Sequence, residues 1–184
     1  MNEITSTSTS IGIYGGIATW MALGPLAGYT LIWAIFIAWG AFAALGGDNA
    51  AMKNTVVCGL FGVFIGWATA LGFLNIPLAE TLGVPVWAGV IVGISAFIVV
   101  VASHMKALEA VSASVLAYAS TFAYLMQTDG KMSNETLSTL DFSNPILLIS
   151  SSVILGALFG KASVLSAPIF MKKEDADVAE VTAP

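Results

Sequence analysis

The segment from residue 39 to residue 62, WGAFAALGGDNAAMKNTVVCGLFG, decides the fold class because a short polar turn there joins two long apolar runs. The turn consists of Gly46, Gly47, Asp48 and Asn49, and Lys53 follows it closely. Glycine often ends a helix and Asp or Asn often caps the next one, so the pattern predicts a capped turn between two helices. Two alternative interpretations are a pore mouth that attracts a partly negative solute and a re-entrant break.

The composition predicts an integral membrane protein. Of the 184 residues, 58% are hydrophobic and 9% are charged, and the mean hydropathy is +0.91. Soluble domains carry about 25% charged residues, so the chain has too few charges to cover a soluble surface. The net charge is −5 and the chain contains no arginine. We therefore expect a lipid bilayer, and no nucleic acid, as its partner.

Six apolar runs are long enough to cross a bilayer as helices, and they lack the alternation of barrel strands. They cover residues 11–26, 27–45, 55–74, 86–103, 111–127 and 145–160, the last with an extension to residue 170. The predicted fold is all-α and polytopic, with about six transmembrane helices in a domain over residues 11–170. Residues 1–10 are expected to form a polar tail, and residues 171–184 a charged, disordered cytoplasmic tail.

The lysines predict the orientation. With six spans, five of the six lysines lie on the side that holds both termini: Lys53, Lys106, Lys161, Lys172 and Lys173. The opposite side has only Lys131. Cytoplasmic loops are enriched in positive residues, so we expect both termini in the cytoplasm.

Glycines at G-x-x-x-G spacing occur in four of the predicted spans. The pairs are Gly12 and Gly16, Gly62 and Gly66, Gly89 and Gly93, and Gly156 and Gly160. Such pairs let helices approach closely, within one protomer or between protomers of a homo-oligomer. Their positions also suggest two three-helix repeats of inverted orientation, as in many transporters, although chance placement of 18 glycines is an alternative.

The fifth run is the most polar and supplies the candidates for a solute path. Ser114, Tyr118 and Thr121 fall on one helical face, and Tyr124 follows one turn later. Hydroxyls can replace the water contacts of an uncharged solute. The alternative is hydrogen bonding between helices or to the preceding turn. Trp39 and Trp67 likewise either bracket a pore or fill the core.

Catalysis is not expected, because the chain lacks a nucleophile–base pair, a phosphate-binding loop and any metal-ligand spacing. No metal and no cofactor are expected. His104 lies at a predicted helix end and is a candidate gate element at the cytoplasmic mouth, together with the glycine turn and Lys53. No predicted span centre holds an acidic or basic residue, which argues against an ion-coupled carrier.

Three segments resemble the YcdZ-like family of small bacterial inner-membrane proteins, a domain of unknown function. They are FAALGGDNAAMKNTVVCGLFGVFIGWATALG, WAGVIVGISAFIVVVASHMKALEAVSASVLAYASTFA and LGALFGKAS. The most recognisable points are Gly46 with Gly47, the run Gly59, Gly62, Gly66 and Trp67, and the late Leu-Phe-Gly. The resemblance covers about residues 11–170 and implies a multi-pass protein of the bacterial inner (cytoplasmic) membrane. It implies no substrate.

Together these patterns predict a channel or facilitator for a small neutral polar solute, acting as a homo-oligomer. The alternative is a non-transporting membrane subunit that scaffolds or regulates a partner complex. A secondary active transporter comes third.

Overall fold

The computed structural model describes residues 2–171, and over these residues the fold is all-α, as predicted. The eight α-helices are α1 (Glu3–Leu23), α2 (Ile32–Ala44), α3 (Asn49–Asn75), α4 (Ala79–Leu82), α5 (Val84–Val101), α6 (Val111–Gln127), α7 (Asn134–Ser138) and α8 (Pro145–Ser166). Three 3₁₀ turns accompany them: η1 (Ala102–His104), η2 (Lys106–Leu108) and η3 (Ala167–Phe170). The predicted tail over residues 171–184 lies, apart from Met171, outside the described residues.

Three helical segments are long and apolar enough to cross a membrane: Asn49–Asn75, Val84–His104 and Pro145–Phe170. The helix Ile32–Ala44 is apolar but shorter. At 1.5 Å per residue, a helix needs about 20 apolar residues to cross the roughly 30 Å hydrocarbon core. The chain is therefore a multi-pass membrane protein.

The first helix begins earlier than predicted. Asn2 caps it by accepting a hydrogen bond from the Thr5 amide at 2.9 Å, so residues 3–10 lie in α1 and not in a polar tail. Ser6 and Ser10 are fully buried because their hydroxyls donate to the carbonyls of Ala167 and Ser163. Packing against the end of α8 thus satisfies polar groups that, in sequence, indicate an exposed segment. By contrast, α6 has the predicted bounds.

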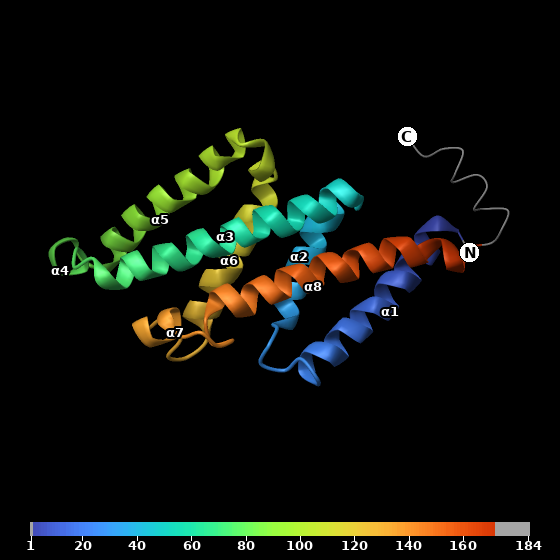
Figure 1. The fold of residues 1–184 in the computed structure, drawn as a ribbon, viewed down its shortest axis with the longest axis horizontal. Helices are drawn as coiled ribbons and strands as arrows, with labels where there is room; N and C mark the ends of the chain where they lie inside the picture. The colour runs from blue at the N-terminus through green and yellow to red at the C-terminus, as the bar shows by residue number, and fades with distance from the viewer. Residues whose placement is uncertain (1, 172–184) are drawn as a thin grey trace.

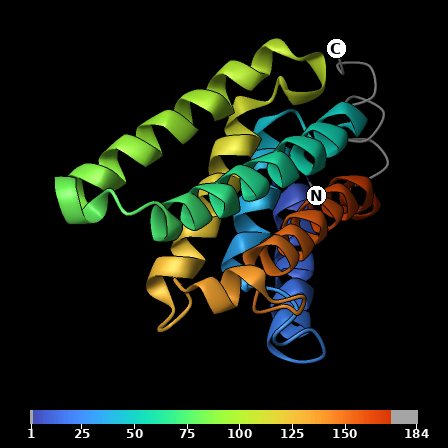
Figure 2. The ribbon, with the colours of Figure 1, turned by 60° about the vertical axis from the view of Figure 1, so that its left-hand side comes forward.

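The six longer helices form a layered arrangement (Figures 1 and 2). Helices α3 and α8 lie side by side, and α2 and α6 cross behind them. Helix α5 packs on α3 at one edge, and α1 packs on α8 at the other (Figure 1). The main neighbours of α2 and α6 are likewise α8 and α3. Helices α3, α5 and α6 therefore form one half of the molecule, and α8, α1 and α2 form the other half with matching neighbours.

Individual contacts repeat between the halves. Gly62 of α3 lies against the Ser114 backbone carbonyl of α6, and Gly156 of α8 lies against the Ile35 carbonyl of α2. One turn further along, a Cβ on Gly66 would meet Thr121 at 3.0 Å. A Cβ on Gly160 would meet Phe42 at 2.5 Å. The two contacts in each half are separated by the same number of residues.

The edge helices repeat the pattern. The Trp87 indole of α5 donates to the Phe73 carbonyl near the end of α3 at 3.2 Å. Near the end of α8, the Ala167 carbonyl accepts from Ser6 of α1. Both edge helices are thus fixed through a carbonyl at the corresponding end of a central helix.

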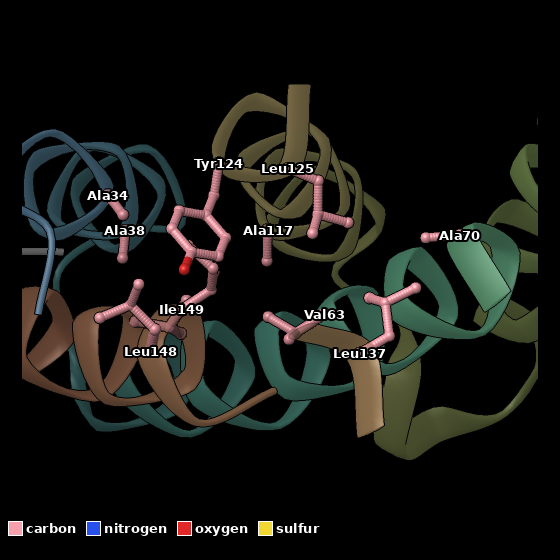
Figure 3. Packing of buried hydrophobic residues seen from close by; sticks show 11 residues of the cluster. Ala34, Ala38, Val63, Ala70, Ala117, Tyr124, Leu125, Leu137, Leu148 and Ile149 are labelled. Carbon is pink, nitrogen blue, oxygen red and sulfur yellow. The ribbon is translucent and has the colours of Figure 1, made fainter. Parts of the chain in front are cut away.

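The largest buried cluster lies between α2, α3, α6 and α8 (Figure 3). Several of its members are alanines, among them Ala34, Ala38 and Ala117, and these small side chains let the four helices approach one another. The Tyr124 ring lies between α6 and α8, directed toward Leu148 and Ile149 (Figure 3). Small residues at the helix crossings therefore hold the core together.

The turn between α2 and α3 is the predicted capped turn. Gly46 and Gly47 have φ angles of +104° and +70°, which residues with a side chain rarely adopt. Their amides donate to the carbonyls of Ala43 and Phe42 at 3.1 Å, which is a Schellman motif. Asp48 then caps α3 by accepting from the Ala51 amide at 2.6 Å.

Candidate functional site

The α1–α2 loop and the α6–α8 connector border a hollow of about 550 Å³, which we call the vestibule. It is lined by Ala27, Gly28, Tyr29, Thr30, Leu31, Tyr124, Lys131, Asp141, Phe142, Ser143 and Leu148. A hollow of this size has the volume of a typical small-molecule site, which is about 300–1,000 Å³.

Two serines of α8 hold the α1–α2 loop in place. The Ser151 hydroxyl donates to the Tyr29 carbonyl at 2.5 Å, and the Ser152 hydroxyl accepts from the Leu31 amide at 2.9 Å. The Tyr29 ring meets the Phe142 ring edge to face, with centroids 5.0 Å apart. Backbone groups removed from water need such partners, so these bonds stabilise the conformation of the loop.

The α6–α8 connector forms the opposite wall of the vestibule, and hydrogen bonds of Asn144 and Tyr124 hold it in place. Asn144 caps α8 by accepting from the Ile146 amide, and its side-chain NH₂ donates to the carbonyls of Leu137 and Thr139 at 3.0 and 2.9 Å. The Tyr124 hydroxyl donates to the Ser143 carbonyl at 2.8 Å. These bonds make the wall of the vestibule a defined surface.

Charge at the vestibule comes from Lys131 and Asp141. The Asp141 carboxylate accepts a hydrogen bond from the Ser143 amide at 2.7 Å, and this bond is the main reason why the pKa of Asp141 lies below its ordinary value. The nearby Lys131 ammonium is a smaller cause in the same direction. Lys131, Asp141 and Ser143 also line an adjoining hollow of about 280 Å³. The site thus presents both signs of charge and several neutral hydrogen-bonding groups.

A second, much smaller cavity of about 10 Å³ lies between α2, α3, α6 and α8; we call it the central cavity. It is lined by Ala34, Ile37, Ala38, Ala41, Thr55, Gly59, Ala113, Leu116, Ala117, Ser120 and Val153. A cavity needs at least about 10–15 Å³ of free volume to hold a water molecule. The central cavity is therefore the size of a single water molecule.

Two hydroxyls line the central cavity. Ser120 donates its proton to the Leu116 carbonyl at 2.8 Å. Thr55 is 1% exposed, and its hydroxyl oxygen has no hydrogen-bond partner among the described residues. Burying a hydroxyl without a hydrogen-bond partner costs free energy of folding, so the position of Thr55 requires an explanation.

Of the predicted path residues on α6, only Tyr124 borders one of these two spaces. Ser114 lies against Gly62, and its hydroxyl has no partner among the described residues. The Tyr118 hydroxyl is 2.7 Å from that of Ser95 on α5, and Thr121 donates to the Ala117 carbonyl at 3.0 Å. Ser114, Tyr118 and Thr121 therefore take part in contacts between helices or within α6.

The two candidate tryptophans lie in different clusters, and neither lines the vestibule or the central cavity. Trp39 is buried and stacks on Phe36 with the ring planes 3° apart. The Trp67 indole donates to the Leu137 carbonyl at 2.8 Å. Both indoles have packing partners that account for their positions.

The candidate mouth residues lie at the opposite end of the helices from the vestibule. Gly46, Gly47, Asp48 and Asn49 form the capped turn and the start of α3. Lys53 and His104 are exposed, and the His104 ring nitrogen Nδ1 lies 2.8 Å from the Val101 carbonyl. None of these six residues lines the vestibule or the central cavity.

The eight candidate packing glycines divide into two groups. Gly62, Gly66, Gly156 and Gly160 lie at close helix crossings within the chain. A Cβ added at Gly12, Gly16, Gly89 or Gly93 would meet no heavy atom within 4 Å. The second group therefore lies on faces that the described part of the chain leaves open.

Sequence reasoning did not single out Thr55, Tyr29, Lys131 or Asp141 as site residues. For Thr55 a signal was present, because Thr55, Gly59 and Gly62 share one helical face at i, i+4 and i+7 spacing. For the vestibule no local signal exists, since its walls come from two distant loops. Among the described residues no group of His, Cys, Asp and Glu could hold a metal ion.

A family model described as a protein of unknown function, DUF1097, matches residues 8–168. The chain belongs to this family. No curated protein and no solved structure matches the chain. The expectation that the chain belongs to a family of unknown function is thus confirmed, and the family is DUF1097.

Proposed function

We propose that this DUF1097 protein is a facilitator or channel for a small neutral polar solute, built from two inverted three-helix repeats that together supply six spans. One repeat is α1–α3, and the other is α5, α6 and α8. The observation that carries the proposal is the central cavity, lined by matched residues from both halves: Ala34 with Ala113, Ala38 with Ala117, Ala41 with Ser120, and Gly59 with Val153. Transporters with inverted repeats hold their substrates near the midplane, where the repeats meet.

The repeated contacts support the symmetry. Relating Gly62 to Gly156 and Ser114 to Ile35 also relates Gly66 to Gly160 and Thr121 to Phe42 without any adjustment of register. The same relation brings the Phe73 carbonyl onto that of Ala167. Where α3 meets α8, a Cβ on Gly59 would lie 2.7 Å from Val153, which is the counterpart of Gly59 in the other repeat. Chance placement of glycines does not explain a consistent register in two helix pairs, α3 with α8 and α6 with α2.

The chemistry of the two spaces supports an uncharged solute. The residues that line the central cavity are apolar apart from Thr55 and Ser120, and none is charged. Moving an unpaired ion into such a place costs several kcal/mol or more. The vestibule has charges of both signs and neutral donors and acceptors, which suits the first binding of a polar molecule.

For orientation we propose the bacterial inner membrane, with both termini cytoplasmic and the vestibule on the outer side. A Cβ added at Gly47 would lie 3.5 Å from a methyl group of Val164 near the end of α8, and Asn54 donates to Glu109 of the α5–α6 loop at 3.3 Å. These contacts gather Lys53, Lys106 and Lys161 at one end of the bundle, while Lys131 lies at the vestibule end. The positive-inside rule favours this orientation.

The test is uptake by proteoliposomes that contain the purified protein. A panel of water, ammonia, small amides, polyols, amines and carboxylates is compared with empty liposomes, with and without ion gradients. We expect faster entry of one or more uncharged solutes and no acceleration of carboxylates. If nothing enters faster than into empty liposomes, the proposal fails.

A second experiment tests whether the solute passes through the vestibule. In a Cys58→Ala background, Ser143→Cys at the vestibule wall is labelled with a bulky maleimide, and flux should fall by about tenfold, which corresponds to about 1.4 kcal/mol. The matched control is Leu140→Cys in the same connector, since Leu140 is 95% exposed and does not line the vestibule. Equal flux after both labels would exclude the vestibule from the path.

The second candidate, a non-transporting subunit that scaffolds a partner or associates with itself, is favoured by the open glycines on α1 and α5. Helix faces with small residues support close association in a bilayer. A stable complex with a different membrane protein, together with no flux of any solute, would favour this candidate. Self-association alone is compatible with the homo-oligomeric facilitator.

A further inference from the structure

We propose that the central cavity is a binding site for one uncharged, water-sized molecule that donates hydrogen bonds, such as water or ammonia, held between Thr55 of α3 and Ser120 of α6. This inference rests on the proposed function for its role in transport, but the binding site itself does not.

The first argument is the hydroxyl of Thr55. Two other buried threonines of the long helices bond back to their own helix: Thr69 donates to the Ile65 carbonyl at 2.7 Å, and Thr121 to that of Ala117 at 3.0 Å. Thr55 does not do this, although it is 1% exposed and lies in the same kind of helix. Ser114 of α6 also lacks a partner among the described residues, but it does not line the central cavity. Thr55 lines the central cavity, where a guest would give its hydroxyl a partner.

The second argument is the state of Ser120. Its proton is used in the bond to the Leu116 carbonyl at 2.8 Å, so toward the cavity its oxygen can only accept. Thr55 can both donate and accept. A guest that satisfies both hydroxyls must therefore donate to Ser120, which water and ammonia do.

The third argument is size and charge. The cavity volume of about 10 Å³ is close to the smallest space that a water molecule occupies. Its remaining walls are alanine, glycine and larger aliphatic side chains. Urea or glycerol does not fit without separation of the helices, and an ammonium ion would find no countercharge.

The position of Thr55 distinguishes the two halves. The relation that matches Gly59 to Val153 matches Thr55 to Ile149, which is fully buried in the core. Ser120 differs in the same way from its counterpart Ala41. Packing alone would be satisfied by the apolar counterparts, so the two hydroxyl residues favour a guest that forms hydrogen bonds.

The binding test compares thermal unfolding of the purified wild type with Thr55→Val, which keeps the shape and removes the hydroxyl. If a guest satisfies Thr55, the variant loses a hydrogen bond and its unfolding midpoint should fall by about 2–4 °C. Thr55→Ser should restore most of the loss. If the cavity is empty, removing an unpartnered hydroxyl leaves the midpoint unchanged or raises it, and the inference fails. Thr69→Val is the matched control for loss of a hydroxyl that bonds to its own helix.

The transport test separates the possible guests. In proteoliposomes, osmotic water flux and ammonia-driven alkalinisation are measured for the wild type, Thr55→Val and Thr69→Val, with urea and glycerol as larger solutes. We expect Thr55→Val to slow the transported small guest about tenfold relative to Thr69→Val, the equivalent of one lost hydrogen bond. Rapid urea or glycerol flux that is insensitive to Thr55→Val would overturn the inference and leave the proposed function standing. A lowered midpoint without flux of any solute would overturn the proposed function and leave the site standing.

Discussion

Gly156 of α8 lies so close to the Ile35 backbone carbonyl of α2 that a Cβ at this position has no room. A backbone oxygen cannot move aside as a side chain can. The α2–α8 crossing therefore depends on the absence of a single methyl group. Gly62 has the same relation to Ser114 in the other half.

Gly156→Ala should destabilise the protein by about 1–3 kcal/mol or more, because the added methyl forces the two helices apart. The control is Gly40→Ala in α2, where a Cβ meets nothing within 4 Å and better helix propensity favours alanine by about 0.5–1 kcal/mol. Thermal unfolding in detergent measures both. Equal stability of the two variants would contradict the close crossing.

Asn144→Ala should destabilise the vestibule wall by about 2–4 kcal/mol, since it removes the cap of α8 and two buried side-chain bonds. Asn134→Ala serves as the control, because Asn134 is exposed and pairs with an exposed Asn75. Denaturant or thermal unfolding gives the difference. A loss as small as that of the control would mean that the connector is not held by Asn144.

Acid should weaken the vestibule wall through Asp141. Its pKa is lowered in the folded state, chiefly by the Ser143 amide, so its stabilising contribution is present above its ordinary pKa of about 3.9 and is lost as the pH falls through the lower folded value. Unfolding midpoints between pH 7 and pH 3 should therefore drop less for Asp141→Asn than for the wild type. Asp129→Asn is the charge-matched control, and an identical pH profile for all three proteins would contradict the prediction.

The orientation of the chain is tested by labelling single cysteines in a Cys58→Ala background, which removes a fully buried native thiol. Lys131→Cys should react with a membrane-impermeant maleimide added to spheroplasts, in which the inner membrane is intact. Lys53→Cys should react only after the inner membrane is opened. The reverse pattern would invert the proposed topology.

Gly93→Leu should weaken self-association if the open face of α5 meets a second copy of the chain. Folding should be unaffected, because nothing in the described part of the chain lies within 4 Å of a Cβ at this position. Crosslinking and mass measurement in detergent report the oligomeric state. Gly40→Leu is the control for an equally open glycine on α2, and the same oligomer in both variants would argue against the α5 face.

Much of the fold was predictable because its causes are local. Hydropathy located the helices, and the bounds of α6 are as predicted. The Gly46–Gly47 turn with its Asp48 cap follows from backbone preferences of these residue types. The start of α1 was not predictable, since Ser6 and Ser10 are polar in sequence and become buried only because α8 supplies acceptors.

The candidate site was less predictable, because it depends on how each helix is rotated against distant neighbours. The polar face of α6 was recognised, but α3 and α5 cover it, with Ser114 against Gly62 and Tyr118 against Ser95. Thr55, which lines the central cavity together with Ser120, belongs to the run that contains Gly59 and Gly62, and in that run only the glycines were recognised from the sequence.

The sequence by itself determined that this is a helical membrane protein, where its main helices lie and how the turn after α2 is capped, since apolar length and capping residues act within a few turns of one helix. Only the tertiary structure decided which glycines lie at crossings, which buried hydroxyls lack a partner among the described residues, and where the vestibule and the central cavity lie. Those features arise where helices far apart in the chain meet, and a contact between two surfaces is not encoded in either surface alone.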